Sequence, residues 1–500
     1  MAAEETNPEE FDVLIVGAGL SGVGMACHLQ MESPGKSFAI LERRQAIGGT
    51  WDLFRYPGIR SDSDMFSFGY EFRPWHEPKV LADGPSIRNY VAETAREYGV
   101  EDKIRFGLRI TRADWSSEEA RWTLTAVHEP SGETRHYRCH YLVLCTGYYR
   151  YDAGYMPEFP GIERYRGTVV HPQNWPEGLD YEGKRVVVIG SGATAMTLVP
   201  AMAPDTGHIT MLQRSPSYII SLPAFDKISA WLKRILPDDW VFAMARRRNI
   251  RLQRILYTAS QRYPRFMRWL LMRGVRKQLG KDFDMRHFSP SYNPWDERLC
   301  AVPDADLFKV LREGRASVVT DHIDTFTEDG IRLRSGKTLE ADIVIAATGL
   351  EVQLMGGMEI AVDGETRPPN EVMTYKGVLI EDAPNLAVIF GYTNASWTLK
   401  ADIAAKYICR LLNHMDAEGY VSATPRDEEG CAEEDTSVLD SLSAGYVRRA
   451  SHRLPRQGRK LPWRVLNHYL RDRKILLEEP IEDGYLAFDR EVRPRKQQAA

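Results

Sequence analysis

Near the start of the chain, three glycines stand where a nucleotide phosphate could bind. Gly17, Gly19 and Gly22 directly follow the apolar run 13–16, and a helical pattern begins among them. A continuous apolar run predicts a parallel strand that is buried on both faces. Glycines after such a strand allow a tight turn and a close approach to a pyrophosphate, and the helix that follows offers free N–H groups and its positive dipole end. The order of strand, glycines and helix therefore predicts a nucleotide site.

The same pattern occurs a second time further along the chain. Gly190, Gly192 and Thr194 follow Arg185 and the apolar run 186–189, and Ala195 takes the place of the third glycine. A single turn of this kind is weak evidence, because glycine-rich turns are common. Two copies in one chain favour two nucleotide sites over the alternative, which is two ordinary strand–turn–helix units of an α/β core.

The residue that follows the second strand of each unit distinguishes the two predicted ligands. In the first unit it is Glu42, and a carboxylate there accepts hydrogen bonds from ribose hydroxyls and repels a 2′-phosphate. In the second unit it is Arg214, followed by Ser215, and a guanidinium pairs with two phosphate oxygens at once. The alternative for Arg214 is a solvated cation at a strand end. We therefore predict FAD at the first site and NADPH at the second, a pair that moves hydride from nicotinamide to flavin.

Composition and cysteine usage narrow the class of protein. With 500 residues, of which 43% are hydrophobic and 27% charged, the chain has the composition of an ordinary globular protein of about three domains. A net charge of −4 gives no reason to expect nucleic acid as a partner. No two of the six cysteines form a CxxC pair, so neither a metal site nor a redox dithiol is predicted. The acidic first residues and the lack of an apolar run of about 18 residues lead us to expect a cytoplasmic protein without a membrane span.

A segment just before the second glycine turn resembles a known fingerprint. Tyr165, Gly167, His171, Trp175 and Pro176 are spaced as in F-x-G-x-x-x-H-x-x-x-W-P, with Tyr in place of the first Phe. This is similar to the linker fingerprint of the class B flavoprotein monooxygenases of the type I Baeyer–Villiger kind. The likeness extends through nearly the whole chain and is greatest to the subgroup of the ethionamide-activating monooxygenase. In this family the segment links two domains, which implies that His171 is a structural joint rather than an acid or base.

Two further segments strengthen the resemblance on the flavin side. The turn 48–51, which contains Thr50 and Trp51, is similar to the family's flavin-contacting turn. The run 56–62 resembles the segment that places an aspartate near the flavin, which implies this position for Asp62. A Pro-Gly turn inside that run directs the following residues into a cleft. The alternative for Asp62 is an N-cap of the next helix.

A fourth segment carries the expected catalytic side chain. The run 293–299 resembles the stretch that holds the family's active-site arginine, which implies this role for Arg298; the alternative is a surface ion-pair partner. Many relatives have a lysine directly before this arginine, where it helps to hold the 2′-phosphate, but this chain has Glu297. The preference for NADPH then depends on Arg214 and Ser215.

The resemblance implies a reaction as well as a fold. The expected enzyme uses FAD, NADPH and O₂ to convert small-molecule ketones to esters or lactones through a C4a-peroxyflavin, and also oxidises sulfides or thioamides. Arg298 would supply fixed positive charge beside the reacting oxygen, and Asp62 would orient Arg298. The alternatives are a flavin-containing monooxygenase that oxidises nitrogen or sulfur and, in another class, a non-catalytic NADPH-sensing or membrane-docked protein.

A basic block interrupts the second nucleotide unit. Residues 227–281 contain 15 Lys and Arg against two acids, Asp238 and Asp239, with apolar residues at helical spacing. In the resembling family a helical insertion occurs here. Three interpretations remain open: a solvated face packed on the body of the protein, peripheral contact with an anionic membrane, and, least favoured, nucleic-acid binding.

The predicted fold is α/β, with two Rossmann-like dinucleotide-binding domains and a helical insertion. We expect residues 1–150 to form the first part of the FAD-binding domain. Residues 151–221 and 292–380 would form the NADPH-binding domain, interrupted by the insertion at 222–291. From residue 381 to 500 the chain would return to the FAD-binding domain and end in a tail.

Overall fold

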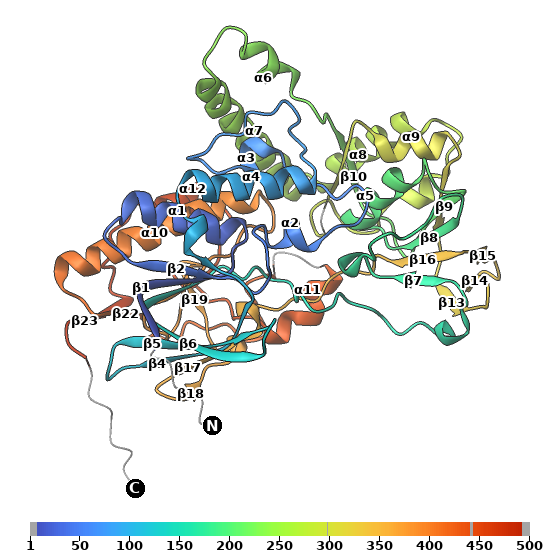
Figure 1. The fold of residues 1–500 in the computed structure, drawn as a ribbon. Coiled ribbons are helices and arrows are strands. Elements are labelled where there is room, and N and C mark those ends of the chain that lie inside the picture. Colours follow the sequence, from blue (N-terminus) through green and yellow to red (C-terminus); the bar gives the residue numbers. More distant parts are fainter. Residues whose placement is uncertain (1–7, 298, 441–443, 493–500) are drawn as a thin grey trace.

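The computed structural model contains two large sheets, which lie side by side with helices packed between and above them (Figure 1). The larger sheet is at the lower left of Figure 1 and the smaller one at the right. The structure describes residues 8–297, 299–440 and 444–492.

The larger sheet has eleven strands and follows the order β18-β17-β4-β5-β6-β1-β2-β3, with β21, β20 and β19 branching from β6. The pairs β1–β2, β1–β6, β2–β3 and β6–β21 are parallel, whereas β4, β5 and β6 form an antiparallel meander. The strands are β1 (Glu9–Val16), β2 (Phe38–Leu41), β3 (Ile104–Arg105), β4 (Leu108–Ser116), β5 (Arg121–His128), β6 (Glu133–Leu144), β17 (Glu359–Val362), β18 (Glu365–Thr366), β19 (Thr374–Tyr375), β20 (Leu379–Ile380) and β21 (Leu386–Val388).

The two faces of β1 explain why the first apolar run has no polar member. Val13 and Ile15 belong to the core on one face of the sheet, and Leu14 and Val16 belong to the core on the other. Each of these side chains is almost fully buried, as expected for a parallel strand covered on both sides.

Helices cover the first of these faces, where α1 packs against α4 and α10, and α10 packs against α12. A further strand pair, β22 and β23, follows α10 in the chain and is antiparallel. These elements and their short neighbours are α1 (Leu20–Glu32), α2 (Thr50–Leu53), α3 (Met65–Phe68), α4 (Gly84–Glu97), α10 (Trp397–Glu418), α11 (Gly445–Ala450), α12 (Tyr469–Leu477), β22 (Ser422–Pro425) and β23 (Leu486–Asp489).

The smaller sheet has the order β12-β9-β8-β16-β7, and all of its strands are parallel. Helices α5 and α9 pack beside it, and a parallel pair β10–β11 and an antiparallel set β13–β15 complete this unit. The elements are β7 (Thr168–Val170), β8 (Arg185–Ile189), α5 (Ala193–Met202), β9 (His208–Gln213), β10 (Ile219–Leu222), β11 (Cys300–Pro303), α9 (Asp306–Arg312), β12 (Ala316–Thr320), β13 (Ile323–Phe326), β14 (Gly330–Leu333), β15 (Thr338–Glu340) and β16 (Ile343–Ala346).

The predicted α/β class with two dinucleotide-binding units is confirmed, because each glycine turn joins a buried parallel strand to a helix. The chain re-enters the larger sheet earlier than residue 381, since β17 already pairs with β4. The strands β17 and β18 extend the edge of that sheet beside β4, and β19 and β20 join it through β21. The other domain boundaries stay a prediction.

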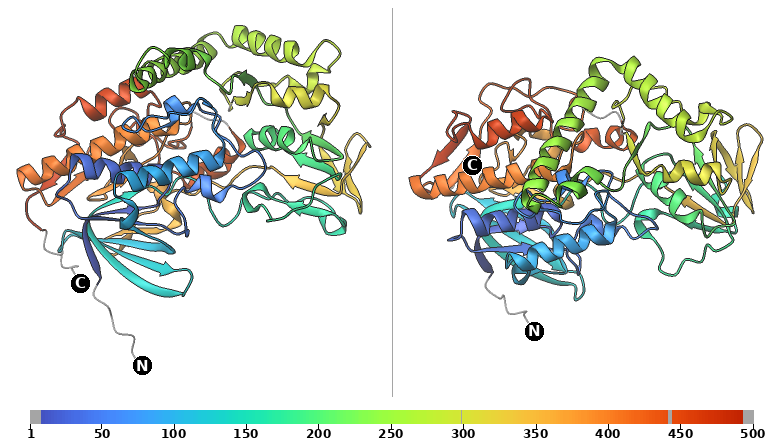
Figure 2. Two further views of the ribbon diagram at one scale, coloured as in Figure 1. Left: turned by 45° about the horizontal axis from the view of Figure 1, so that its top comes forward. Right: turned by 90° about the horizontal axis from the view of Figure 1, so that it is seen from above.

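The basic block forms three helices, α6 (Lys227–Leu232), α7 (Asp238–Arg262) and α8 (Pro264–Leu279). They lie along one outer edge of the molecule, at the top of Figure 1 and opposite β17 and β18, and form the upper rim of the left view in Figure 2. Arg246 of α7 is only 6% exposed and donates hydrogen bonds of 2.8 Å to the carbonyl oxygens of Phe66 and Gly69. One side of α7 is therefore fixed to the unit that contains the larger sheet. In the part of the chain that the structure describes, no helix is both long and apolar enough to cross a bilayer.

Candidate active site

A cavity of about 1540 Å³ connects the two nucleotide units and the helical insertion. The first glycine turn, the 48–51 turn and Asp62 line it from one unit. Thr194 lines it from the second unit, and side chains of α7 line it from the helical insertion. Both nucleotide units therefore face one shared space.

The first turn has room for glycine only. Gly17 has a φ of 105°, and a Cβ added there would lie 2.7 Å from the carbonyl oxygen of Cys145. A Cβ on Gly22 would lie 1.8 Å from the carbonyl oxygen of Gly17. No described side chain caps the start of α1, where Gly19 is the N-cap residue, so the first amides of the helix remain available to a phosphate. The turn fits a pyrophosphate.

Glu42 is fixed against this turn. Its side chain is 4% exposed, and its Oε2 and Oε1 atoms accept hydrogen bonds from the backbone amides of Ala18 (2.6 Å) and Arg44 (2.7 Å). Burial raises the pKa of the Glu42 carboxyl group, while the two backbone hydrogen bonds lower it. Each carboxylate oxygen has a second lone pair, which suits the role predicted for Glu42 as an acceptor for ribose hydroxyls.

The 48–51 turn lies against the first glycine turn. A Cβ on Gly49 would lie 3.0 Å from the Cα atom of Gly19, so the two turns approach each other closely. Thr50 begins α2, and the indole of Trp51 packs edge-on against Phe68 at 5.8 Å between ring centroids. Thr50 and Trp51 both line the cavity, and the contact of this turn with a flavin stays a prediction.

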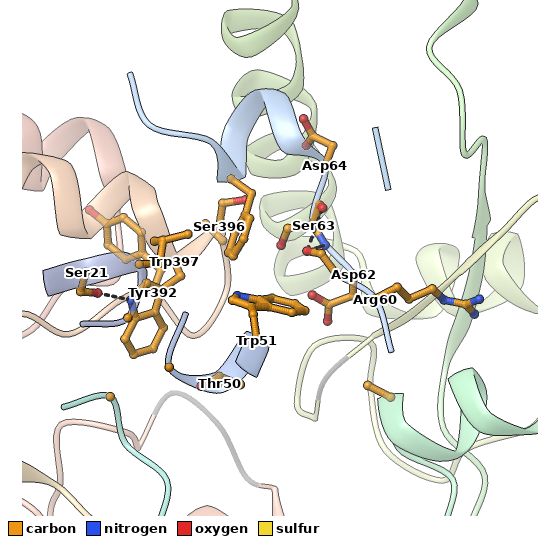
Figure 3. Close-up of a pocket in the computed structure, with 18 of the residues that line it drawn as sticks. Ser21, Thr50, Trp51, Arg60, Asp62, Ser63, Asp64, Tyr392, Ser396 and Trp397 are labelled. Carbon is orange, nitrogen blue, oxygen red and sulfur yellow. Dashed lines mark hydrogen bonds between the residues drawn. The ribbon is translucent and has the colours of Figure 1, made fainter. Parts of the chain in front are cut away.

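The segment that ends at Asp62 is anchored on the second unit. Gly58 has a φ of 75°, and a Cβ there would lie 2.6 Å from the Cβ atom of Ala201 in α5. Arg60 donates a 2.6 Å hydrogen bond to Asp306 of α9. Figure 3 shows the side chain of Arg60 extending away from Trp51, whereas Asp62 lies beside Trp51. The segment thus reaches from one unit to the other and brings a carboxylate into the cavity.

Arg298 lies outside the described residues. Its neighbours Trp295 and Leu299 line the cavity. Burial raises the pKa of Glu297, whereas the positive charges of Arg448 and Arg214 lower it. The residue that replaces the family's lysine thus lies within the electrostatic field of the predicted phosphate-binding arginine.

The second glycine turn is tight at its start and open at its end. Gly190 has a φ of 138°, and a Cβ there would lie 2.3 Å from the carbonyl oxygen of Ala347. Around Gly192 there is no atom within 4 Å of an added Cβ among the described residues. Thr194, the second residue of α5, lines the cavity. The geometry fits a second dinucleotide whose phosphates lie over an exposed turn.

Arg214 and Ser215 lie beside this turn but do not line the cavity. Both are exposed, and the hydroxyl of Ser191 in the turn donates a 2.9 Å hydrogen bond to the carbonyl oxygen of Ser215. An exposed guanidinium next to a phosphate-binding turn can meet a 2′-phosphate at the distal end of the nucleotide.

Sequence reasoning missed a polar cluster that the insertion brings into the cavity. Asn249 and Gln253 of α7 donate hydrogen bonds of 2.8 and 3.2 Å to the two carboxylate oxygens of Asp64. All three residues line the cavity. The sequence contains one indication of this cluster: Asn249 and Gln253 lie one helical turn apart in a block that is otherwise basic and apolar.

A second group was missed because it forms only when the chain returns to the larger sheet. Trp397, at the start of α10, donates a 2.8 Å hydrogen bond from Nε1 to the hydroxyl of Ser21 in α1 (Figure 3). Tyr392 and Ser396 line the same wall of the cavity. No local pattern pairs these residues with the first glycine turn.

Comparisons with known proteins agree with this geometry. A model of the flavin-binding monooxygenase-like family matches residues 11–415. The MymA protein of Mycobacterium tuberculosis is 63% identical over 484 residues, which cover 96% of this chain and 98% of MymA. The FAD-containing monooxygenase EthA of the same organism is 49% identical over 490 residues, which cover 97% and 99% of the two chains.

Solved structures share the fold at low sequence identity. An oxidized steroid monooxygenase bound to NADP has a TM-score of 0.77 and 21% identity, with 96% of this chain and 99% of that one covered. A cyclohexanone monooxygenase bound to epsilon-caprolactone has a TM-score of 0.70 and 21% identity, with coverages of 83% and 90%. The predicted resemblance to flavoprotein monooxygenases is confirmed, and the chain belongs to the flavin-binding monooxygenase-like family.

Proposed function

We propose that this protein is an FAD- and NADPH-dependent monooxygenase that uses O₂ to convert small-molecule ketones to esters or lactones and that also oxidises sulfides or thioamides. The observation that carries the proposal is the single cavity shared by two dinucleotide-binding units. The name of EthA, an FAD-containing monooxygenase, supports the cofactor, and the titles of the steroid and cyclohexanone monooxygenase structures support NADP and a carbonyl substrate.

Each unit would hold one cofactor. The first glycine turn, Glu42 and the Thr50–Trp51 turn would bind FAD, and the second turn with Arg214 and Ser215 would bind NADPH. When bound, these cofactors supply hydride transfer and the activation of O₂. The chain itself supplies binding, orientation and a cavity whose lining is mostly apolar.

The proposed catalytic side chain is Arg298, on the evidence of the sequence. A fixed guanidinium beside the substrate carbonyl would stabilise the negative charge that develops on its oxygen, and a preorganised donor of this kind contributes about 10²–10³ in kcat. Asp62, held in the cavity by the Gly58 turn and the Arg60–Asp306 ion pair, would be the positioning residue for that guanidinium.

The test is to purify the protein with its flavin and to measure NADPH oxidation, O₂ consumption and product with a methyl ketone and a thioether. We expect equal consumption of NADPH and O₂ and an ester product.

The role of Arg298 is tested by substitution. Arg298→Ala should keep its flavin, and its rate of ester formation should fall about 10²-fold or more. Arg298→Lys is the control for charge without the planar guanidinium. Ester formation at an undiminished rate in Arg298→Ala would refute the assignment, and NADPH binding without O₂ consumption would indicate a non-catalytic sensor.

A location in the cytoplasm, with peripheral membrane contact through residues 227–281, is part of the proposal. All six cysteines are buried thiols, which is typical of a reducing compartment. The contact with the membrane depends on the surface of the helical insertion.

A further inference from the structure

Exposed apolar side chains are concentrated on the helical insertion. Of the 17 large hydrophobic residues that are exposed in the described part of the chain, 12 fall between residues 225 and 270. We call their exposed side chains the insertion surface: Phe225, Ile228, Trp231, Ile235, Trp240, Met244, Leu252, Ile255, Tyr263, Phe266, Trp269 and Leu270.

These side chains are exposed although they belong to amphipathic helices that also have a buried side. On α7, Trp240 is 66% exposed, and Met244 follows one helical turn later on the same side. Phe242 and Arg246, on the other side of the helix, are buried against the larger unit. The apolar residues of the exposed side are therefore not part of the core of this chain.

Arginines are interleaved with the apolar residues. Arg247, Arg251 and Arg254 are exposed on α7, and none of them has a salt bridge to a described acidic residue. The block 227–281 carries a formal charge of +13 in a chain whose total is −4. The positive charge is thus a local property of this surface.

The cavity opens on the same surface. Phe225, Ile228, Leu252 and Ile255 are each at least half exposed, and all four also line the cavity. A molecule that rests on the insertion surface is therefore in contact with the mouth of the proposed active site.

We propose that the insertion surface docks on an anionic lipid bilayer and that the cavity takes apolar substrate from the lipid. This inference deepens the proposed function and rests on it for the substrate. Exposed tryptophans and arginines on amphipathic helices are the combination that binds membrane interfaces, because the rings enter the headgroup region while the cations meet anionic lipids. A second copy of the chain is disfavoured as the occupant, since a symmetric contact would bring two strongly basic faces together.

The first experiment is flotation of the flavin-loaded protein with vesicles of phosphatidylglycerol and phosphatidylcholine, or of phosphatidylcholine alone. We expect binding to the anionic vesicles that weakens at high salt. The variant Trp231→Ser/Trp240→Ser/Trp269→Ser should reduce the vesicle-bound protein at least about tenfold, because three exposed rings that do not line the cavity are removed. The matched control, Met31→Ser/Met156→Ser/Leu470→Ser, removes three exposed apolar side chains elsewhere and should bind as the wild type does.

A second pair of variants tests the charge. Arg251→Glu/Arg254→Glu should abolish the preference for anionic vesicles, whereas Arg334→Glu/Lys337→Glu, which reverses two exposed charges near β14, should not. Oxidation of a water-soluble ketone should be the same in all four variants, and oxidation of a long-chain ketone dissolved in the vesicles should fall only in the two insertion variants.

The outcomes separate this inference from the proposed function. Wild-type protein that does not float with anionic vesicles, or tryptophan and control variants that bind alike, would overturn the docking surface while leaving the oxygenase intact. Vesicle binding without oxidation of any ketone or thioether would instead overturn the proposed function. A dimer that dissociates in the tryptophan variant, without vesicle binding in the wild type, would assign the surface to a second copy of the chain.

Discussion

The two glycine turns follow the same local pattern but have opposite surroundings. At the first, Gly22 packs against the backbone of Gly17, and the diagnostic Glu42 is almost fully buried. At the second, the space around Gly192 is open, and the diagnostic Arg214 is exposed. A buried site with its polar groups already hydrogen-bonded suits a cofactor that stays in place. An open site with an exposed cation suits a nucleotide that must arrive and leave in every catalytic cycle.

The largest effect is expected when one glycine in each turn is replaced by alanine and flavin binding is compared between the two variants. Gly22→Ala forces a Cβ to within 1.8 Å of a backbone oxygen, and overpacking of about 1–3 kcal/mol would weaken flavin binding about 10–100-fold. The flavin content of the purified protein and its thermal midpoint measure the loss. Gly192→Ala is the matched control, with no described atom within 4 Å of the new Cβ, and it should keep its flavin and stability while binding NADPH more weakly. Loss of flavin in both variants would show that the two turns are not distinct.

Removing the exposed cation should affect only the second site. Arg214→Ala takes away charge-assisted hydrogen bonds worth about 1.5–3 kcal/mol, so the KM for NADPH should rise about 10–100-fold. The KM for NADH, which has no 2′-phosphate, should not change, and neither should the flavin content. Arg334→Ala, an exposed arginine outside both sites, is the control. An equal rise for both nucleotides would assign Arg214 a structural role instead.

The smallest expected effect concerns Glu297, whose negative charge lies in the field of Arg214. Glu297→Lys should lower the KM for NADPH about two- to fivefold, the size of a partly screened charge interaction. Glu297→Gln should give a smaller gain. Since burial raises the pKa of Glu297, the wild-type carboxylate becomes neutral at a higher pH than an ordinary glutamate does, so the advantage of Glu297→Gln should shrink as the pH is lowered. A gain that is independent of pH would contradict a charge effect.

Features set by local sequence were predictable. The glycines of both turns could be read from their position between an apolar run and a helix, because the turn needs the same backbone geometry wherever it occurs. Glu42 could be placed for the same reason, since it follows the next strand of the same unit. The sequence did not indicate that both of its oxygens are held by backbone amides.

Features set by tertiary packing were not predictable. Asn249 and Gln253 meet Asp64 only because α7 docks on the larger unit through Arg246, and no spacing in the sequence fixes that register. Trp397 reaches Ser21 across 376 positions because α10 packs beside α1. The sequence predicts the return to the larger sheet only from residue 381, whereas β17 already pairs with β4, because a short strand at the edge of a meander lacks a distinctive pattern.

The anchoring of Gly58 and Arg60 on α5 and α9 has a mechanical consequence. The chain segment that carries Asp62 follows the 48–51 turn of the first nucleotide unit. It is nevertheless anchored to α5 and α9 of the second nucleotide unit. If the smaller sheet rotates relative to the larger one, the contacts of Gly58 and Arg60 with α5 and α9 would move Asp62 together with the second unit. The position of this carboxylate would then report which way the second unit is turned, without any separate moving loop.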